Sequence, residues 1–275
     1  DAVPSGTTDT YSSITAGSGA ISIGKDGLTS FANGMIDEVM VFDDDLTQLQ
    51  AADLRANILN GMPSWRLTHP KTFIRHWPLN NHTRDLMNGN DGTWVGTEAY
   101  TEGDYERSVG DFNGSSTISV PDSLATRFGL TDFSFSFSLN FGDGIGSNRG
   151  LLEKVEGTSF YEVIKSTADK IRFRIRDASS NLATCLSDTA VALGRTYHII
   201  CVCPRGETLR IYMDGRLDQD QGDTSGVGDI STTTALTLCD VSAVSEFKGG
   251  GSDFKLHSCA LTSDEGKELF MMSMN

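Results

Sequence analysis

The sequence predicts an all-β fold, an antiparallel β-sandwich with short capped helices at the domain ends. Three observations lead to this fold class. Apolar and polar residues alternate at every second position in several runs, clusters of Gly, Asp, Asn and Ser separate these runs at short spacings, and only two segments carry helix-start signals. A period of two is typical of strands with one face against a core, and many short strands between turns are typical of a sandwich.

The clearest alternation lies in DFSFSFSLNF, residues 132–141, and in KIRFRIRD, residues 170–177. In the first run the apolar side chains share one face and three serines and an asparagine share the other. In the second run Ile171, Phe173 and Ile175 face inward and three arginines face outward. We therefore expect two strands of half-buried sheet.

Other runs predict further strands. Asp214 and Gly215 follow one of these runs and favour a tight hairpin, because both residue types tolerate a positive φ. The runs are TISVP from 117, GLLEKV from 150, FYEVIK from 160, TYHIICVC from 196, TLRIYM from 208, ALTLC from 235 and DFKLHS from 253.

Two helices are expected, one after Thr47 and one after Thr262. Each threonine is followed three residues later by Gln50 or Glu265, which is the pattern of a capping box. The shared capping-box pattern indicates an internal repeat, because residues 20–54 align with residues 235–269 with one gap. The N-terminal segment thus has the pattern of the closing piece of a domain.

Several motifs occur in an order that resembles laminin-G-like domains, which belong to the concanavalin A-like jelly rolls. They are HWPLNNHTRDLMNGNDGTW from 76, FNGSSTISVPDS from 112, TYHIICV from 196, LRIYMDGRL from 209 and SDFKLHSCALTSDE from 252. The resemblance implies a complete domain over residues 72–275, a linker over 61–71, and the incomplete C-terminal part of a second such domain over 1–60. A small isolated sheet is marginal in water, so we expect the missing upstream part, a partner subunit or the second domain to cover that first segment.

The charge balance excludes some partners. The 37 acidic and 22 basic residues give a formal net charge of −15, which repels phosphate backbones and anionic membrane surfaces. No apolar run is long enough to span a bilayer. The first residues lack both an initiating Met and a secretion signal, so we expect a processed product or a piece of a longer chain. Five scattered cysteines without a CxxC pair favour assembly in a reducing compartment.

A catalytic site is not predicted. Glycosidases of this fold use two close carboxylates, commonly in an E-x-D-x-E arrangement, and no such triplet occurs. Asp37 and Glu38 are adjacent and point to opposite faces, and Glu153, Glu156 and Glu162 form no alternating pair. The chain also lacks a GxSxG elbow and an HExxH spacing. His198, within TYHIICV, is expected to be packed in the structure.

Calcium is the expected cofactor, in a structural role. The resemblance implies an ion between the opening segment and the last strand, held by an acidic residue of that strand. The matching positions are Asp253 in SDFKL and Asp37 or Glu38 in IDEVM. Asp85 or Asp91 would add a ligand from the opening loop. DQDQGD, residues 218–223, is a second candidate. Each of these acidic residues has an alternative interpretation as part of a solvated turn.

Sugar-binding modules present aromatic rings flat to the ligand, with amides and carboxylates around them. Trp94 is the residue we predict for this role. Four other aromatic residues have polar neighbours, and each of them could equally belong to the core or its rim. They are Tyr100, Tyr105, Phe160 and Tyr161.

These observations favour a non-catalytic binding or structural module that presents its surface for adhesion or assembly, with glycans or protein subunits as partners. Composition and the resemblance suit a virion surface protein, such as a decoration or fibre component, or a bacterial surface protein. The alternative is a calcium-dependent carbohydrate-binding module of a cell-surface or secreted protein. A polysaccharide-degrading glycosidase is the third and least favoured class. We expect an extracellular or virion-surface location, without membrane insertion.

Overall fold

The structure is a computed structural model, and it describes residues 25–26, 30–31, 73–87, 89–103, 108–242 and 244–273. The chain divides into two units, residues 1–64 and 65–275. In the first unit the described part is the antiparallel pairing of β1 (Lys25–Asp26) with β2 (Ser30–Phe31). The predictions for residues 1–60, for the helix after Thr47 and for the linker 61–71 lie outside the described residues.

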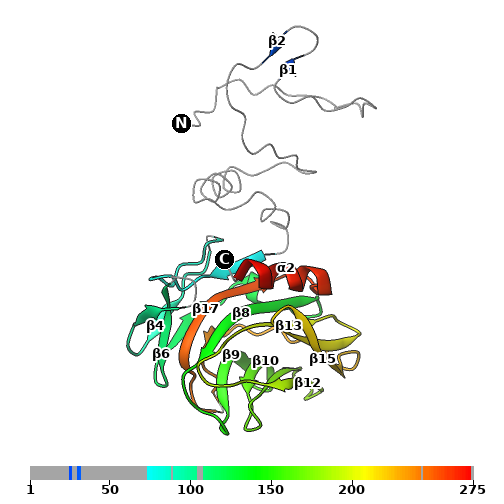
Figure 1. Cartoon of the computed structure of the whole chain (residues 1–275). Coiled ribbons are helices and arrows are strands. Elements are labelled where there is room, and N and C mark those ends of the chain that lie inside the picture. Colours follow the sequence, from blue (N-terminus) through cyan, green and yellow to red (C-terminus); the bar gives the residue numbers. More distant parts are fainter. Residues whose placement is uncertain are drawn as a thin grey trace. The chain divides into compact units, whose positions relative to one another are not determined.

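The described part of the second unit is built on two antiparallel sheets, as the sequence predicts (Figure 1). The first has seven strands, in the spatial order β12 (Leu182–Ala190), β11 (Lys170–Arg176), β10 (Ser159–Lys165), β9 (Arg149–Glu156), β16 (Leu236–Leu238), β7 (Thr117–Val120) and β4 (Thr93–Val95).

The second sheet has eight strands, in the order β15 (Arg216–Asp223), β14 (Thr208–Met213), β13 (Thr196–Cys203), β8 (Phe133–Phe141), β17 (Lys248–His257), β6 (Ser108–Asn113) and β5 (Tyr100–Glu102), with β3 (Phe73–Trp77) paired to the other half of β17. A short 3₁₀ helix, η3 (Leu124–Thr126), follows β7, and α2 (Ser263–Ser273) follows β17. Every strand run that we predicted above overlaps one of these strands.

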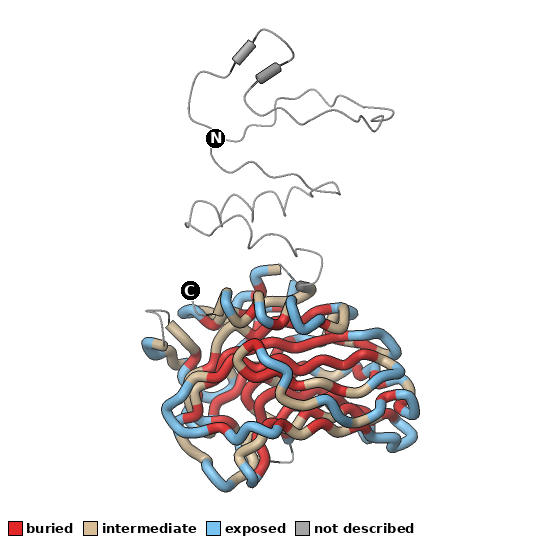
Figure 2. The backbone as a smooth tube through the Cα atoms, turned by 45° about the vertical axis from the view of Figure 1, so that its right-hand side comes forward, coloured by how far each residue is buried: buried red, intermediate tan, exposed pale blue. Residues whose placement is uncertain are grey.

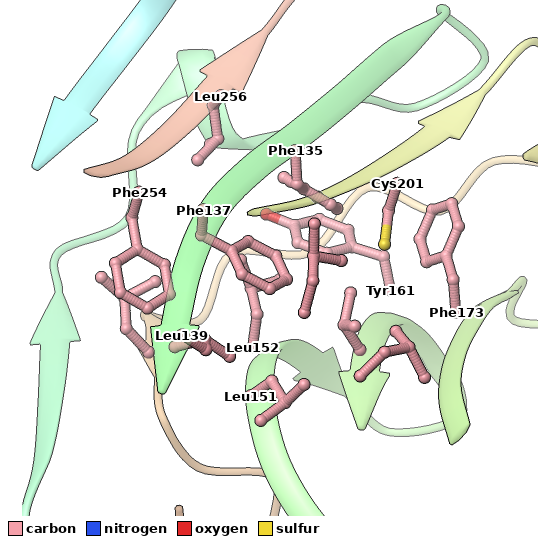
Figure 3. Close-up of a cluster of buried hydrophobic side chains, with 14 of the residues drawn as sticks. Phe135, Phe137, Leu139, Leu151, Leu152, Tyr161, Phe173, Cys201, Phe254 and Leu256 are labelled. Atoms are coloured by element: carbon pink, nitrogen blue, oxygen red, sulfur yellow. The ribbon is translucent and has the colours of Figure 1, made fainter. Parts of the chain in front are cut away.

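The core lies between the two sheets, because the alternating side chains of both sheets point into it. Phe133, Phe135, Phe137, Leu139 and Phe141 of β8 are fully buried. Figure 3 shows several of them meeting side chains of the opposite sheet, among them Leu151, Leu152, Tyr161 and Phe173. Together they form one continuous hydrophobic cluster, in which the burial of large apolar side chains stabilises the fold.

The other face of β8 differs from our prediction. The serines of β8 were expected to be exposed, but Ser134 and Ser136 are fully buried and Ser138 nearly so. The reason is the segment after β17, since Ser134 Oγ donates to the carbonyl of Cys259 and accepts from the N–H of Leu261. The strand is thus buried on both faces. Figure 2 shows that long stretches of the strands in this unit consist of buried residues.

Helix α2 packs on this outer face of the eight-stranded sheet. Leu261 and Leu269 form a second apolar cluster with Ile200, Val202 and Tyr212 of β13 and β14. The helix begins with the predicted capping box, because Thr262 Oγ1 accepts from the N–H of Glu265 and a carboxylate oxygen of Glu265 accepts from the N–H of Thr262.

Two local predictions are confirmed, the hairpin turn at Asp214 and Gly215 and the packing of His198. Asp214 and Gly215 connect β14 to β15 with φ values of 50° and 73°, which is the conformation that a two-residue hairpin turn requires. Cys201 and Cys203 are fully buried in the core, and all five cysteines are free thiols. His198 is also buried, at 4% exposure, as predicted.

Candidate functional site

On the outer face of the seven-stranded sheet, polar residues at paired positions of neighbouring strands form a row across the sheet. Its register places Glu162 of β10 opposite Glu153 of β9 on one side and Arg174 of β11 on the other. Glu153 is also opposite Thr237 of β16. The row continues in both directions, with Thr184 beyond Arg174 and with Ser119 and Thr93 beyond Thr237. Hydrogen-bonding groups therefore cross the whole sheet.

Glu162 holds the guanidinium of Arg174 in place. Nε of Arg174 donates to Glu162 Oε1 over 2.7 Å, and Nη2 contacts the same oxygen. The guanidinium also lies over the ring of Phe160, 5.4 Å from its centroid. Because Glu162 is 3% exposed and Arg174 is half-buried, the carboxylate lies beneath and the arginine is presented to solvent.

Glu153 holds the loop after β16 against the same face. Its Oε2 accepts from the backbone N–H of Ser242 over 2.9 Å. Gly150 lies under this loop, because a Cβ at that position would be 2.1 Å from the nitrogen of Val241. Burial raises the pKa of Asp240 in the loop, and the charges of Glu246 and Glu153 raise it further. The loop thus adds negative charge to one side of the polar row.

Strand β11 adds two further arginines to the face. Arg172 and Arg176 flank Arg174 at two-residue spacing, so all three point outward as the sequence predicts. Arg176 donates to Ser180 Oγ over 2.8 Å. Sequence reasoning placed these arginines on the surface but did not recognise them as part of a site.

The predicted calcium ligands Asp85 and Asp253 both lie beside His76. The backbone N–H of His76 donates to Asp85 Oδ1, and Nε2 of His76 lies 2.9 Å from Asp253 Oδ1. Burial lowers the pKa of His76, and the hydrogen bond to Asp253 opposes that shift. The structure therefore brings together the predicted ligands Asp85 and Asp253.

Asp85 is nevertheless engaged with other donors. Its Oδ1 also accepts from the N–H of Met87, its Oδ2 accepts from the N–H of Asn90, and Nε of Arg75 lies 3.3 Å from Oδ2. The residue would have to give up some of these donors to bind Ca²⁺, which needs several free oxygen ligands. Asp91 accepts from the N–H of Asp85 and so supports the same loop.

The other parts of the calcium prediction stay predictions. Asp37 and Glu38 lie outside the described residues. Within the described ranges, no group of three or more His, Cys, Asp or Glu side chains is arranged to hold a metal ion. Residues 218–223 belong to strand β15 and not to a loop.

Trp94 lies at an edge of the sandwich where the two sheets meet. Its Nε1 donates to the hydroxyl of Tyr100 over 3.0 Å, and the two rings meet edge to face at 5.8 Å. It also contacts the buried ring of Phe112, at 4.9 Å between centroids. Trp94 thus joins β4 of one sheet to β5 of the other, and its predicted role in ligand binding stays a prediction.

The other aromatic candidates have different positions. Phe160 lies under Arg174 on the polar face, and Tyr161 is a core residue whose hydroxyl donates to the carbonyl of Thr126. Tyr105 lies outside the described residues. In the part of the chain that the structure describes, no helix is long and apolar enough to cross a membrane.

Solved structures with the same fold include domains that are named for binding. The binding domain of Paraclostridial Mosquitocidal Protein 1 matches with a TM-score of 0.62 and 13% identity, over 74% of this chain and 53% of that chain. The binding domain of botulinum neurotoxin serotype D matches with a TM-score of 0.60 and 10% identity, over 74% of this chain and 51% of that chain. The chain therefore spans about half the length of these toxin domains.

A third structure matches along almost all of its length. It is domain 4 of AbnA, an extracellular GH43 arabinanase from Geobacillus stearothermophilus, in complex with arabinotriose. Its TM-score is 0.56 at 15% identity, over 72% of this chain and 98% of that chain. At these identities the likeness shows the fold alone.

No curated protein matches the sequence. A family model described as the concanavalin A-like lectin/glucanases superfamily, of the laminin-G type, matches residues 112–265. This range covers more than half of the chain and includes most strands of both sheets. It also contains the motifs from 112, 196, 209 and 252 on which the resemblance rests. The chain belongs to the concanavalin A-like lectin/glucanase superfamily.

Proposed function

We propose that the sandwich is a non-catalytic binding module that recognises a glycan on the outer face of its seven-stranded sheet. The fold is shared with toxin binding domains and with an arabinanase domain solved with arabinotriose. The polar row supplies what sugar hydroxyls need, since arginine donors and threonine and serine hydroxyls lie along one face.

The observation that carries this proposal is the arrangement of Arg174. Its guanidinium is held by the carboxylate of Glu162 and by the ring of Phe160, over which it lies. A side chain held in this way loses little conformational entropy when a ligand binds, so its hydrogen bonds contribute more to affinity. Glu153 and Glu162 are 6% and 3% exposed, and in this proposal they position the surface groups instead of contacting the sugar.

Titration calorimetry with a panel of oligosaccharides, arabinotriose among them, tests the proposal. We expect at least one to bind, and we expect Arg174→Lys to weaken that binding about tenfold, because lysine cannot reproduce the planar pair of donors. Arg216→Lys, at an exposed position of β15 in the other sheet, serves as the control and should leave affinity unchanged. Release of sugar products from any bound oligosaccharide would contradict a non-catalytic role.

Calcium and Trp94 remain part of the proposal. We propose that Ca²⁺ stabilises the edge where Asp85 and Asp253 lie, and that Trp94 adds an aromatic contact for the glycan at the sandwich edge. The half-buried ring of Trp94 supports such a contact, because it leaves part of its surface to solvent. Trp94→Phe, which keeps the ring packing, should then weaken glycan binding without unfolding the domain.

Adhesion or assembly is the second candidate function, and virion-surface or other extracellular placement belongs to it. Two exposed leucines favour a protein partner. Leu124 is 82% exposed and Leu130 is 65% exposed, and both lie in the connection from β7 to β8. Light scattering after size exclusion tests this candidate. An oligomer that Leu124→Ser and Leu130→Ser convert to a monomer would support it, and a monomeric full chain would contradict self-assembly.

A further inference from the structure

Arg172 differs from the two other arginines on the outward face of β11. Arg174 is paired with Glu162, and Arg176 donates to Ser180. Arg172 makes no hydrogen bond or ion pair with any described residue, and its Nε is enclosed without an acceptor. Its guanidinium is therefore a half-buried cation, and its terminal nitrogens are available to hydrogen-bond a ligand.

The neighbours of Arg172 make its charge costly. The sheet register places Ile164 of β10 and Leu186 of β12 on its two sides, and Ile164 is fully buried. Burial lowers the pKa of Arg172 and the positive charge of Arg174 lowers it further, while the charge of Glu162 opposes part of this shift. An unpaired cation beside apolar side chains and a second cation is unfavourable, and an incoming anion removes this penalty.

We infer that Arg172 is the subsite of the glycan face that binds a carboxylate, so that the preferred ligand contains a uronic acid. This inference rests on the proposed glycan-binding function. The two terminal nitrogens of a guanidinium form a planar fork that matches the two oxygens of a carboxylate. Thr184 and Arg174, in the adjacent row of the same face, are placed to contact hydroxyls of the same or a neighbouring sugar.

The overall charge argues for single carboxylates and against a densely charged polyanion. The chain has a formal net charge of −15, and long-range repulsion would oppose a ligand with many closely spaced charges. One half-buried arginine, in contrast, acts over a short distance and is screened less by salt.

Calorimetry with three trisaccharides of the same linkage tests the inference: one of galacturonate, one of neutral galactose and one of galactose 6-sulfate. We expect the galacturonate form to bind about tenfold or more tightly than the neutral form. Arg172→Gln should abolish this preference, because the affinity for the galacturonate form falls to that for the neutral form. Arg176→Gln, on the same strand and face, is the matched control and should keep the preference.

The fold of the variant can be checked separately. Because Arg172 has no partner to lose, Arg172→Gln should melt at the same temperature as the native protein or at a higher one. A clear drop in melting temperature would show that Arg172 supports the structure, and it would overturn the assignment of an unpaired ligand-binding residue.

Each binding result decides a different point. Equal affinity for galacturonate and galactose overturns the carboxylate subsite and leaves the proposed glycan binding intact. A preference that persists in Arg172→Gln overturns the role of Arg172. Tighter binding of the sulfated form than of galacturonate overturns the choice of a carboxylate. Absence of binding by these trisaccharides and by the whole oligosaccharide panel overturns the inference and the proposed function together.

Discussion

Glu153 and Glu162 face each other across β9 and β10, so two carboxylates lie at directly opposed positions on one face of a sheet. Like charges in such a pair repel, and both residues are almost fully buried. Arg174 compensates the charge of Glu162, and the N–H of Ser242 donates to Glu153. The arrangement is stable because each carboxylate has its own donor, and its effect is to fix Arg174 and the loop after β16.

The first prediction concerns the unequal roles of these two glutamates. Glu162→Gln should lower the free energy of unfolding by about 1–3 kcal/mol, because Arg174 loses its charged acceptor beneath the surface. Glu153→Gln should cost less, since an amide oxygen can still accept from Ser242 and the repulsion with Glu162 disappears. Urea denaturation measures both. Equal losses for the two variants would contradict the division of roles.

The second prediction concerns the loop that covers Gly150. An added Cβ there would lie 2.1 Å from Val241 N and 2.5 Å from the carbonyl carbon of Asp240, so the loop must move. We expect Gly150→Ala to destabilise the protein by several kcal/mol or to detach the loop, which proteolysis would detect. Gly226→Ala is the control, because a Cβ at Gly226 meets nothing within 4 Å. A harmless Gly150→Ala would show that the loop is not held against this face.

The third prediction concerns a buried ion pair at one end of the sandwich. Nζ of Lys154 is enclosed and donates to Asp122 and to Thr126 Oγ1. Asp122 also accepts a hydrogen bond from Arg127. This bond, and after it the bond from Lys154, lowers the pKa of Asp122 to about 2. Asp122→Asn should therefore cost about 3 kcal/mol, because it leaves the charge of Lys154 buried without a counter-ion.

A double-mutant cycle checks the cause of this loss. Lys154→Met combined with Asp122→Asn removes both charges, so the double variant should be more stable than Asp122→Asn alone. If the two substitutions are simply additive, the pair does not interact as the structure indicates. The ion pair also predicts that acid destabilises the protein as the pH falls from about 3.8 through about 2, when Asp122 takes up a proton in the fold.

Much of the fold could be predicted because its core signal is local. The alternation in residues 133–141 and the capping box at Thr262 depend on neighbouring residues, and both are confirmed. The burial of Ser134 and Ser136 could not be predicted from β8 itself. It depends on the segment after β17, more than a hundred residues away in the chain, and no periodicity within a strand reports such a covering element.

The candidate site was missed for a similar reason, although one signal was present. Pairing of Glu153 with Glu162 follows from a two-residue turn at Gly157 and Thr158, which sets Glu156 opposite Ser159. Gly157 has a φ of 60°, and a Gly between two alternating runs indicates such a turn. The search for carboxylates within one strand overlooked this cross-strand pair. To predict that Arg174 of β11 is the partner of Glu162, one would also have to know that β11 is the next strand in the sheet.

The fourth prediction concerns calcium. If Asp85 and Asp253 hold an ion, calcium should raise the melting temperature and a chelator should lower it. At a free concentration of about a hundred times Kd the stabilisation would be roughly 2.7 kcal/mol. Asp253→Asn should remove the effect while it keeps the backbone, because Asp253 has a φ of 55° that asparagine tolerates. Asp229→Asn, in a distant turn, is the control. Identical melting curves with calcium and with chelator would contradict this cofactor.

The fifth prediction concerns buried histidines on the outer face of the eight-stranded sheet. His198 faces Phe270 of α2, with 6.0 Å between ring centroids, and His257 lies 3.2 Å from Ser136 Oγ. Burial, and after it the charge of Lys255, lowers the pKa of each from an ordinary 6.5 to about 3. Both rings are therefore neutral in the folded state at pH values where the unfolded chain binds protons.

Stability should fall as the pH is lowered from about 6.5 toward 3, because the unfolded state takes up about two more protons than the folded state at these residues. Above pH 6.5 both states carry neutral rings, and this contribution is constant. His198→Leu should reduce the slope of unfolding free energy against pH by about one proton, since Nδ1 of His198 has no hydrogen-bond partner to lose. Urea denaturation between about pH 7 and 4.5 avoids most carboxylate titration. If His198→Leu leaves this slope unchanged, the ring is already charged in the fold and α2 is not packed over a neutral histidine.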